Sequence, residues 1–272
     1  MTMFISERVD LRLLDDISDA TRALVEVADV DPDDILLIGA RCRDVLHSGL
    51  GHATTTRATR DLDLGIAVAD GDGYERLATH FRRIGSNGVG YRIADLPVDV
   101  VPFGPRIEDP RGVARPTSRR DGIAVFGFQQ VFERALPLFL PSGHAIRLPR
   151  PEGYSLLKLR AWLDRRTTGD ADDIALAVHW YTESTSVRER LYDDLAVLET
   201  HDFNELVASA HILGSDMRQQ LSAQDATALV SLVERRGLHD LTSRLIGLPH
   251  DRGLRREVVD AFAAGLQAAD DD

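Results

Sequence analysis

The fold is decided by the stretch RATRDLDLGIAV, which spans residues 57–68. From residue 62 onward, apolar and other residues alternate as they do in a half-buried strand. The apolar positions should face a core, which leaves Asp61, Asp63 and Gly65 together on the opposite face. The Cα atoms of Asp61 and Asp63 lie roughly 6.6 Å apart on such a strand, so the carboxylate oxygens can converge on one or two hard cations. A solvated strand edge is the alternative explanation of this pair.

Residues 34–46, upstream of this stretch, are predicted to form a short buried strand, a glycine turn and a helix. Gly39 stands at the turn, where the lack of a side chain allows close approach of the backbone. The first helical turn that follows, at Ala40 and Arg41, offers backbone amides that favour an anion. An ordinary strand-to-helix turn would have the same pattern, so this segment indicates an anion-binding site only in combination with the two aspartates.

A third acidic residue lies downstream in the strand-like sequence VDVVPFG, residues 98–104. Asp99 is flanked there by valines, an unusual setting for a carboxylate that lacks a partner or a metal. The three motifs resemble those of the nucleotidyltransferase superfamily typified by DNA polymerase β, which combines a glycine turn, a DxD strand and a third carboxylate on a neighbouring strand. Within that superfamily the chain is most similar to the AbiEii/MenT-type nucleotidyltransferase toxins, through residues 38–41, 57–63 and 98–104.

A fourth matching segment, PEGYSLLKLRAWLDRR, covers residues 151–166 and is followed by GDADDI at 169–174. It resembles the "KL-x-A-W-x-D-R … D-A-x-D" segment of the same family. Lys158 is the sole lysine among 32 Lys and Arg residues. A chain that otherwise uses arginine, yet has lysine here, suggests a site that needs a compact ammonium group. The resemblance extends over roughly residues 35–182.

The resemblance implies a Mg²⁺-dependent nucleotidyltransferase that transfers NMP from an NTP to a hydroxyl acceptor. Asp61, Asp63 and Asp99 would hold two Mg²⁺ ions, and Asp99 could instead accept the hydroxyl proton, although the ligand role is preferred. The family turn often carries serine where this chain has Ala40, so phosphate binding would depend more on the backbone and on basic side chains. The expected nucleotide-binding residues are Gly39, Ala40, Arg41, Arg57 and Lys158.

Lys158, Trp162 and Arg165 fall on one face of the helix predicted to begin at residue 151. Lys158 is expected to reach the nucleotide pocket, and an interdomain salt bridge to Asp170 or Asp173 is the competing interpretation. Those two aspartates open the next helix. They would either position the catalytic groups without contacting the substrate, or cap the helix and pair with the neighbouring arginines.

Arginines are concentrated between residues 106 and 120, a segment that contains five arginines and only two acidic residues. Prolines and glycines predict a loop for this segment. A solvated loop is one interpretation, and contact with acceptor RNA phosphates is the other. The candidate RNA contacts are Arg111, Arg115, Arg119 and Arg120.

The resemblance to the toxins implies the 3′ end of tRNA as acceptor and a cognate antitoxin as partner. A small-molecule acceptor, as in antibiotic nucleotidyltransferases, is the alternative enzyme, and a catalytically silent nucleotide- or RNA-binding module is the alternative of another class. The arginine-rich loop favours RNA over a cationic drug, which would need an acidic pocket. The three intact carboxylates argue against the silent module.

The bulk composition fits a cytoplasmic protein. The 272 residues are 43% hydrophobic and contain one cysteine, which excludes an internal disulfide. No apolar run is long enough to span a membrane, and the beginning of the chain lacks the pattern of a signal peptide. The net charge of −12 argues against a protein-wide electrostatic attraction to nucleic acid, so any RNA contact must be local.

The predicted fold class is α+β, with a nucleotidyltransferase-type mixed sheet flanked by helices and an all-helical C-terminal part. The domain boundary is placed near residue 150, where proline and glycine become rare, and gives a core over 1–150 and a helical domain over 151–272. Residues 85–90, although glycine-rich, are interpreted as a turn because they follow a helix and precede a strand. Strands are also expected at 122–128 and 145–148 in the same sheet. Residues 187–272 lie outside the stretch that resembles the family and are interpreted as either a solvated helical appendage or a surface for a partner.

Overall fold

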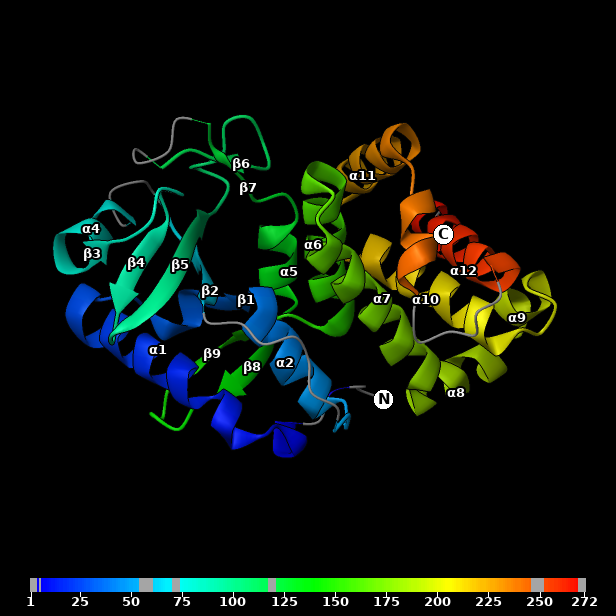
Figure 1. Ribbon diagram of the computed structural model, residues 1–272, viewed down its shortest axis with the longest axis horizontal. Helices are drawn as coiled ribbons and strands as arrows, with labels where there is room; N and C mark the ends of the chain where they lie inside the picture. The colour runs from blue at the N-terminus through cyan, green and yellow to red at the C-terminus, as the bar shows by residue number, and fades with distance from the viewer. Residues whose placement is uncertain are drawn as a thin grey trace. The chain divides into compact units, whose positions relative to one another are not determined.

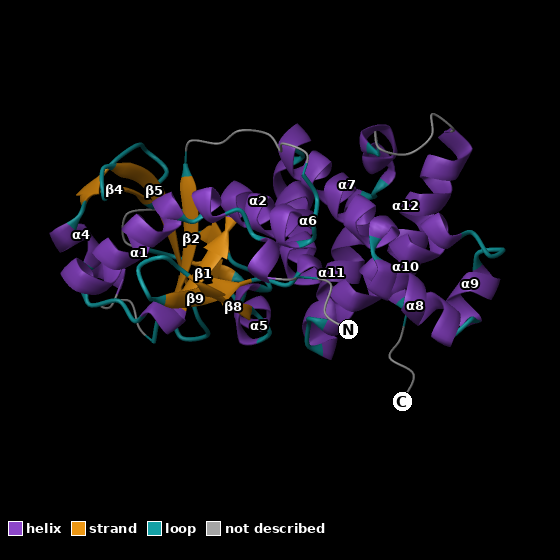
Figure 2. Cartoon of the chain, turned by 90° about the horizontal axis from the view of Figure 1, so that it is seen from below, coloured by secondary structure: helices purple, strands orange, loops and turns teal. Residues whose placement is uncertain are grey.

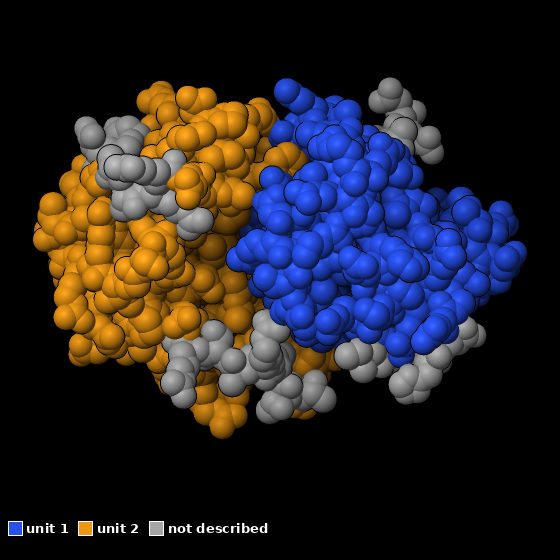
Figure 3. Space-filling model, turned by 45° about the horizontal axis from the view of Figure 1, so that its top comes forward, with its two compact units in different colours: residues 1–3, 151–272 blue, residues 4–150 orange. Residues whose placement is uncertain are grey.

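The computed structural model describes residues 4, 6–53, 61–69, 74–116, 121–245 and 252–268. The chain divides into two compact units, Phe4–Arg150 and Pro151–Asp272, which are coloured separately in Figure 3. It has a mixed α+β architecture, in which a seven-stranded sheet with helices is followed by C-terminal helices (Figure 1). This confirms the expected fold class at that level.

The first unit contains a mixed sheet in which β2 runs parallel to β5 and β1 runs parallel to β9, whereas the other neighbouring strands are antiparallel. In spatial order the strands are β3 (Arg82–Arg83), β4 (Gly90–Ile93), β5 (Leu96–Phe103), β2 (Leu62–Ala67), β1 (Ile35–Ile38), β9 (Ala145–Leu148) and β8 (Leu136–Phe139).

The burial of the central strands follows from their sequences. All four residues of β1 are buried, as expected for an uninterrupted apolar strand between two neighbours. On β2, Leu62 and Leu64 are buried and Asp63 between them is half-buried, so the predicted alternation of burial is present over these three residues, whereas Gly65 is buried. Tyr74 supports the buried face of β5, because its hydroxyl donates to the Val100 carbonyl at 2.9 Å. Burial raises the pKa of that hydroxyl.

Two longer helices pack beside the sheet. Helix α1 (Asp15–Ala28) contacts β4 and β5 through a face that includes Ile17 and Leu24, and it ends at Asp29 in a left-handed conformation. Helix α2 (Gly39–Gly49) leaves the end of β1 and contacts β1 and β2. The remaining helical elements are η1 (Ser6–Arg8), η2 (Leu11–Leu13), η3 (Pro32–Asp34), α4 (Leu77–His80) and α5 (Phe128–Glu133).

The sheet differs from the sequence analysis in one wrong prediction and one strand that was not predicted. The strand expected at 122–128 does not join the main sheet: β7 (Ile123–Ala124) pairs with β6 (Val113–Ala114) in a separate two-stranded sheet within the arginine-rich segment. Glycines with positive φ at 112 and 122 allow this local pairing. Strand β8, which contains Pro137, was not predicted from the sequence. Its place at the edge of the sheet explains why the proline is tolerated.

The second unit is helical throughout its described part (Figure 2). Helices α8 and α9 are separated at Asp194, and residues 239–244 form a 3₁₀ helix. Side chains of Thr167, Ser184, Asn204 and Ser222 cap four of the helices. The elements are α6 (Pro151–Arg165), α7 (Thr168–Glu183), α8 (Thr185–Asp193), α9 (Ala196–Thr200), α10 (Glu205–Gln219), α11 (Ala223–Arg236), η4 (His239–Arg244) and α12 (Arg252–Gln267).

Helices α10 and α12 approach each other closely at two glycines. A Cβ atom on Gly214 would lie 2.3 Å from the Phe262 carbonyl oxygen, and one on Gly265 would lie 2.0 Å from the His211 carbonyl oxygen. The contact therefore requires glycine on both helices. No helix in the described ranges has the length and apolar character needed to cross a lipid bilayer.

Candidate functional site

Two carboxylates lie side by side on the parallel strands β2 and β5. Asp63 is the register partner of Asp99, so the two side chains leave the same face of the sheet on strands about 4.8 Å apart. Both residues are half-buried, whereas the flanking Leu62, Leu64 and Val98 face the core. The structure thus brings together two of the three predicted acidic residues through a long-range pairing.

The glycine turn lies directly against Asp63. Gly39 follows β1 and has a φ of +67°. A Cβ atom at this position would be 2.0 Å from Asp63 Oδ2 and 2.6 Å from its Cγ, so the Asp63 side chain fills the space that any larger residue would need. The carboxylate therefore lies at the beginning of α2, where the helix dipole favours negative charge.

Arg41 has a partner on another helix. Its Nη2 forms an ion pair with Asp16 on α1, and its side chain is 20% exposed. This contact holds the guanidinium on α1, so its expected role in phosphate binding stays a prediction. Ala40 lies beside it in the first turn of α2, which has no side-chain cap from the preceding residue.

Asp61 is exposed and lies immediately before β2, two residues from Asp63. Across the described ranges, no group of three or more His, Cys, Asp or Glu side chains is arranged so that it could hold a metal ion. The pair of Asp63 and Asp99 nevertheless fits Mg²⁺ in the chemistry of its donors, because oxygen ligands from one or two carboxylates are what this ion prefers. The site seen here is a pair rather than the predicted triad.

Asn87 orients the second carboxylate, a function that the sequence analysis missed. Its Oδ1 accepts hydrogen bonds from the backbone N–H groups of Val89, at 3.1 Å, and Gly90, at 2.9 Å. Because these two donors fix the oxygen, the amide Nδ2 must point the other way, and it donates to Asp99 Oδ2 at 2.8 Å. The turn over 85–90 therefore takes part in the site, and the Asn-Gly dipeptide at 87–88 was the available signal.

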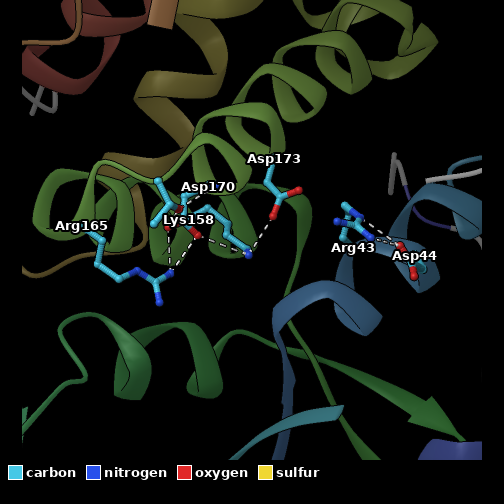
Figure 4. Close-up of polar contacts among 7 residues, drawn as sticks. Arg43, Asp44, Lys158, Arg165, Asp170 and Asp173 are labelled. Carbon is cyan, nitrogen blue, oxygen red and sulfur yellow. Dashed lines mark hydrogen bonds and ion pairs between the residues drawn. The ribbon is translucent and has the colours of Figure 1, made fainter. Parts of the chain in front are cut away.

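A second missed residue is Arg43, one turn into α2. Its side chain is 2% exposed, and its Nη2 lies 2.8 Å from Asp44 Oδ1 (Figure 4). The adjacent Asp44 carboxylate balances the charge of this buried guanidinium, so the two residues form an ion pair close to the glycine turn. The burial of Arg43 depends on tertiary packing, for which the sequence offers no pattern.

Lys158 belongs to an ionic cluster within the helical unit (Figure 4). Its Nζ lies 2.8 Å from Asp173 Oδ2 and 3.7 Å from Asp170 Oδ1, and both aspartates are buried. Arg165 completes the cluster with a 2.8 Å contact to Asp170. The salt bridge considered from the sequence is present, but its expected interdomain character is wrong, because all three residues belong to one unit. The expected reach of Lys158 into the nucleotide pocket stays a prediction.

The cap of α7 is Thr167 rather than either aspartate. Its Oγ1 accepts the backbone N–H of Asp170 at 3.3 Å and donates to the carboxylate of the same residue. Asp170 thus occupies the third helical position of this capping arrangement. It also binds Arg165, and this pairing with a neighbouring arginine was one of the two interpretations of Asp170 from the sequence.

The arginine-rich segment is only partly described. Arg111 and Arg115 are both exposed, and Arg115 Nε donates to the Asp109 carbonyl at 2.7 Å. Arg57, Arg119 and Arg120 lie outside the described residues. The expected contacts of these five arginines with nucleotide or RNA stay predictions.

Comparison of the chain with protein-family models and with curated proteins finds no match. The geometry of the residues themselves therefore carries the functional interpretation.

Proposed function

We propose that this protein is a Mg²⁺-dependent nucleotidyltransferase that transfers NMP from an NTP to a hydroxyl of RNA. The observation that carries the proposal is the in-register pairing of Asp63 with Asp99, with the backbone of Gly39 against the Asp63 carboxylate. This arrangement offers two adjacent anionic ligands next to a helix beginning that suits phosphate. It is also what the resemblance to DNA polymerase β-like enzymes and to AbiEii/MenT-type toxins leads one to expect at these positions.

The residues divide the work by their chemistry. Asp63 and Asp99, with Asp61 two residues before β2, would hold Mg²⁺, which when bound stabilises the charge on the entering and leaving oxygens of an in-line displacement. The backbone at Gly39 and Ala40 would orient the phosphates. Basic side chains would neutralise the departing pyrophosphate, and the proposed residues are Arg41, Arg57 and Lys158.

The proposed acceptor is the 3′ end of tRNA, as in the toxins that the sequence resembles. The arginine-rich segment supports an RNA acceptor, because Arg111 and Arg115 are exposed on a surface of a chain that is otherwise strongly acidic. We also propose a cognate antitoxin as the protein partner and the cytoplasm as the site of action. The tRNA acceptor and the antitoxin follow from the resemblance, whereas the cytoplasmic site of action follows from the composition, which includes a single cysteine.

Incubation with each labelled NTP, Mg²⁺ and total RNA tests the proposal. We expect label to enter RNA of tRNA size, and we expect Asp63→Asn and Asp99→Asn each to abolish the transfer. Asp19→Asn is the matched control, since Asp19 is an exposed aspartate on α1 that pairs with Arg22. Absence of label from RNA with every NTP, or equal transfer by Asp63→Asn, would overturn the proposal.

A further inference from the structure

Two arginines extend from the same sheet face as the paired carboxylates. Asp99 is the register partner of Gly90 on β4, and Arg92 lies two residues further along that strand, hence on the same face. Arg92 is in turn the register partner of Arg82 on the edge strand β3. Both arginines are exposed, and their strands lie at one end of the sheet (Figure 1).

This pair has an unfavourable internal arrangement. Like charges directly opposite each other on antiparallel strands repel, because their Cβ atoms are only about 5 Å apart. Within the described chain, neither guanidinium of the pair lies at ion-pair distance from a carboxylate, and Arg92 instead donates from Nη1 to the Asp95 carbonyl at 2.9 Å. An anion bound between Arg82 and Arg92 would remove the repulsion.

The next residue along β3 shows the contrast. Arg83 is the register partner of the buried Tyr91, so it points to the other face of the sheet. Its Nη2 lies 3.5 Å from Glu75 Oε2, and its guanidinium carbon lies 6.0 Å from the centre of the Tyr91 ring. Internal partners therefore satisfy Arg83, whereas the charges of its neighbour Arg82 face solvent.

The arginine pair and the glycine turn lie on opposite sides of the carboxylates. Gly39 extends β1, next to Asp63 on β2, while β4 and β3 continue the sheet beyond Asp99 on β5. Two strand spacings, about 10 Å in all, separate β5 from β3. If the nucleotide phosphates bind at the glycine turn, an acceptor that approaches the carboxylates from the opposite side would meet the arginine pair.

We propose that Arg82 and Arg92 form a binding site for the phosphodiester backbone of single-stranded RNA, which guides the acceptor strand to the carboxylates. The assignment to the acceptor rests on the proposed function, whereas the anion-binding chemistry does not. Guanidinium groups are suited to phosphate oxygens, because their N–H donors match them in pairs. Residues 74–95 contain four arginines and two acidic residues, so this part of an acidic chain is locally basic.

Edge strands also carry charge for another reason, since charged side chains prevent a strand edge from pairing with other molecules. Under that explanation, neutralising Arg82 and Arg92 would increase self-association and leave RNA affinity unchanged. An RNA-binding role makes the opposite prediction on both measurements.

The test compares Arg82→Gln/Arg92→Gln with Arg83→Gln in the full-length protein. Fluorescence anisotropy would follow binding of a labelled single-stranded RNA of about 12 nucleotides across a series of salt concentrations, without NTP. For the double variant we expect weaker binding and a slope of log K against log salt that is shallower by about 1.4, from two lost phosphate contacts. Arg83→Gln should bind as the wild type does. Arg92→Gln alone, expected to be shallower by about 0.7, serves if the double variant fails to fold.

Unchanged RNA affinity in the double variant, or an equal loss in Arg83→Gln, would overturn the inference, and increased self-association with normal RNA affinity would assign the pair to edge protection instead. Transfer of label by the wild type separates this test from that of the proposed function. Active enzyme with normal RNA binding by the double variant rejects only the arginine site. Arginine-dependent RNA binding without any transfer supports the site and rejects the enzyme.

Discussion

The Asp63 side chain fills the space that a Cβ atom of Gly39 would occupy, with Oδ2 only 2.0 Å from that position. This contact joins the first residue of α2 to β2, the strand that pairs with β1. It makes the identity of residue 39 depend on residue 63, because the left-handed backbone and the carboxylate both exclude a side chain.

Gly39→Ala is therefore expected to destabilise the first unit and to displace the Asp63 carboxylate. The left-handed conformation alone costs about 1–2 kcal/mol for a residue other than glycine, and the steric conflict adds to it. Urea unfolding measures the loss, and transfer of label to RNA measures the effect on activity.

The steric part can be separated in an Asp63→Gly background, which removes the atoms that the new methyl group meets. There, Gly39→Ala should cost only about the backbone term. An equal cost in both backgrounds would show that the contact with Asp63 does not limit residue 39.

Asn87→Ala should lower activity through Asp99. Loss of the amide donor frees the Asp99 carboxylate to rotate, and loss of a residue that orients a metal ligand typically reduces metal affinity or activity about 10- to 100-fold. Titration of transfer activity with Mg²⁺ measures the effect, which should appear as a higher Mg²⁺ requirement. Ser86→Ala, one residue away and also exposed, is the matched control. A Mg²⁺ requirement equal to that of the wild type would contradict the role of Asn87.

Lys158→Met is expected to lower the free energy of unfolding of the helical unit by about 3 kcal/mol, because it leaves the buried carboxylate of Asp173 without its ammonium partner. The double variant Lys158→Met/Asp173→Leu should recover most of this loss, since an apolar pair can replace a buried ion pair. Urea unfolding of the two single variants and the double variant gives the coupling energy. Additive effects would exclude the ion pair as the cause. Nucleotide binding by Lys158→Arg tests the separate catalytic prediction.

The histidine pair in the helical unit should make its stability depend on pH. His201 Nε2 lies 3.0 Å from His211 Nδ1. Burial is the main cause that lowers the pKa of each histidine below the ordinary 6.5, and His201 also lowers the pKa of His211. The unfolded chain therefore binds more protons than the folded one just below pH 6.5, so stability should fall as the pH drops from 7 through the folded pKa values.

Melting temperatures between pH 7.5 and about pH 5 measure this dependence. His211→Gln should have a weaker dependence over the same interval, whereas His239→Gln provides the control, since His239 lies on η4 and is separate from the pair. Identical pH profiles for the wild type and His211→Gln would contradict the prediction.

Local sequence patterns were sufficient to predict some features. The alternation around Asp63 identified β2, and four apolar residues before Gly39 identified β1 and the turn. The pairing of Asp63 with Asp99 could only be expected from the family resemblance, because register depends on the partner strand. Asn87 was missed because its role depends on a carboxylate twelve residues away. The arginine pair was missed because Arg82 and Arg92 lie opposite each other only when β3 pairs with β4 at the edge of the sheet.

The parallel register of β2 and β5 also favours the native strand pairing over a pairing shifted by one residue. A slip of one residue would turn Asp99 into the core and expose Val98 and Val100, which are fully buried in the native pairing. The penalty for burying that charge would prevent the slipped sheet from closing. A misregistered chain would therefore fail to fold, rather than accumulate as a compact protein whose carboxylates are misaligned.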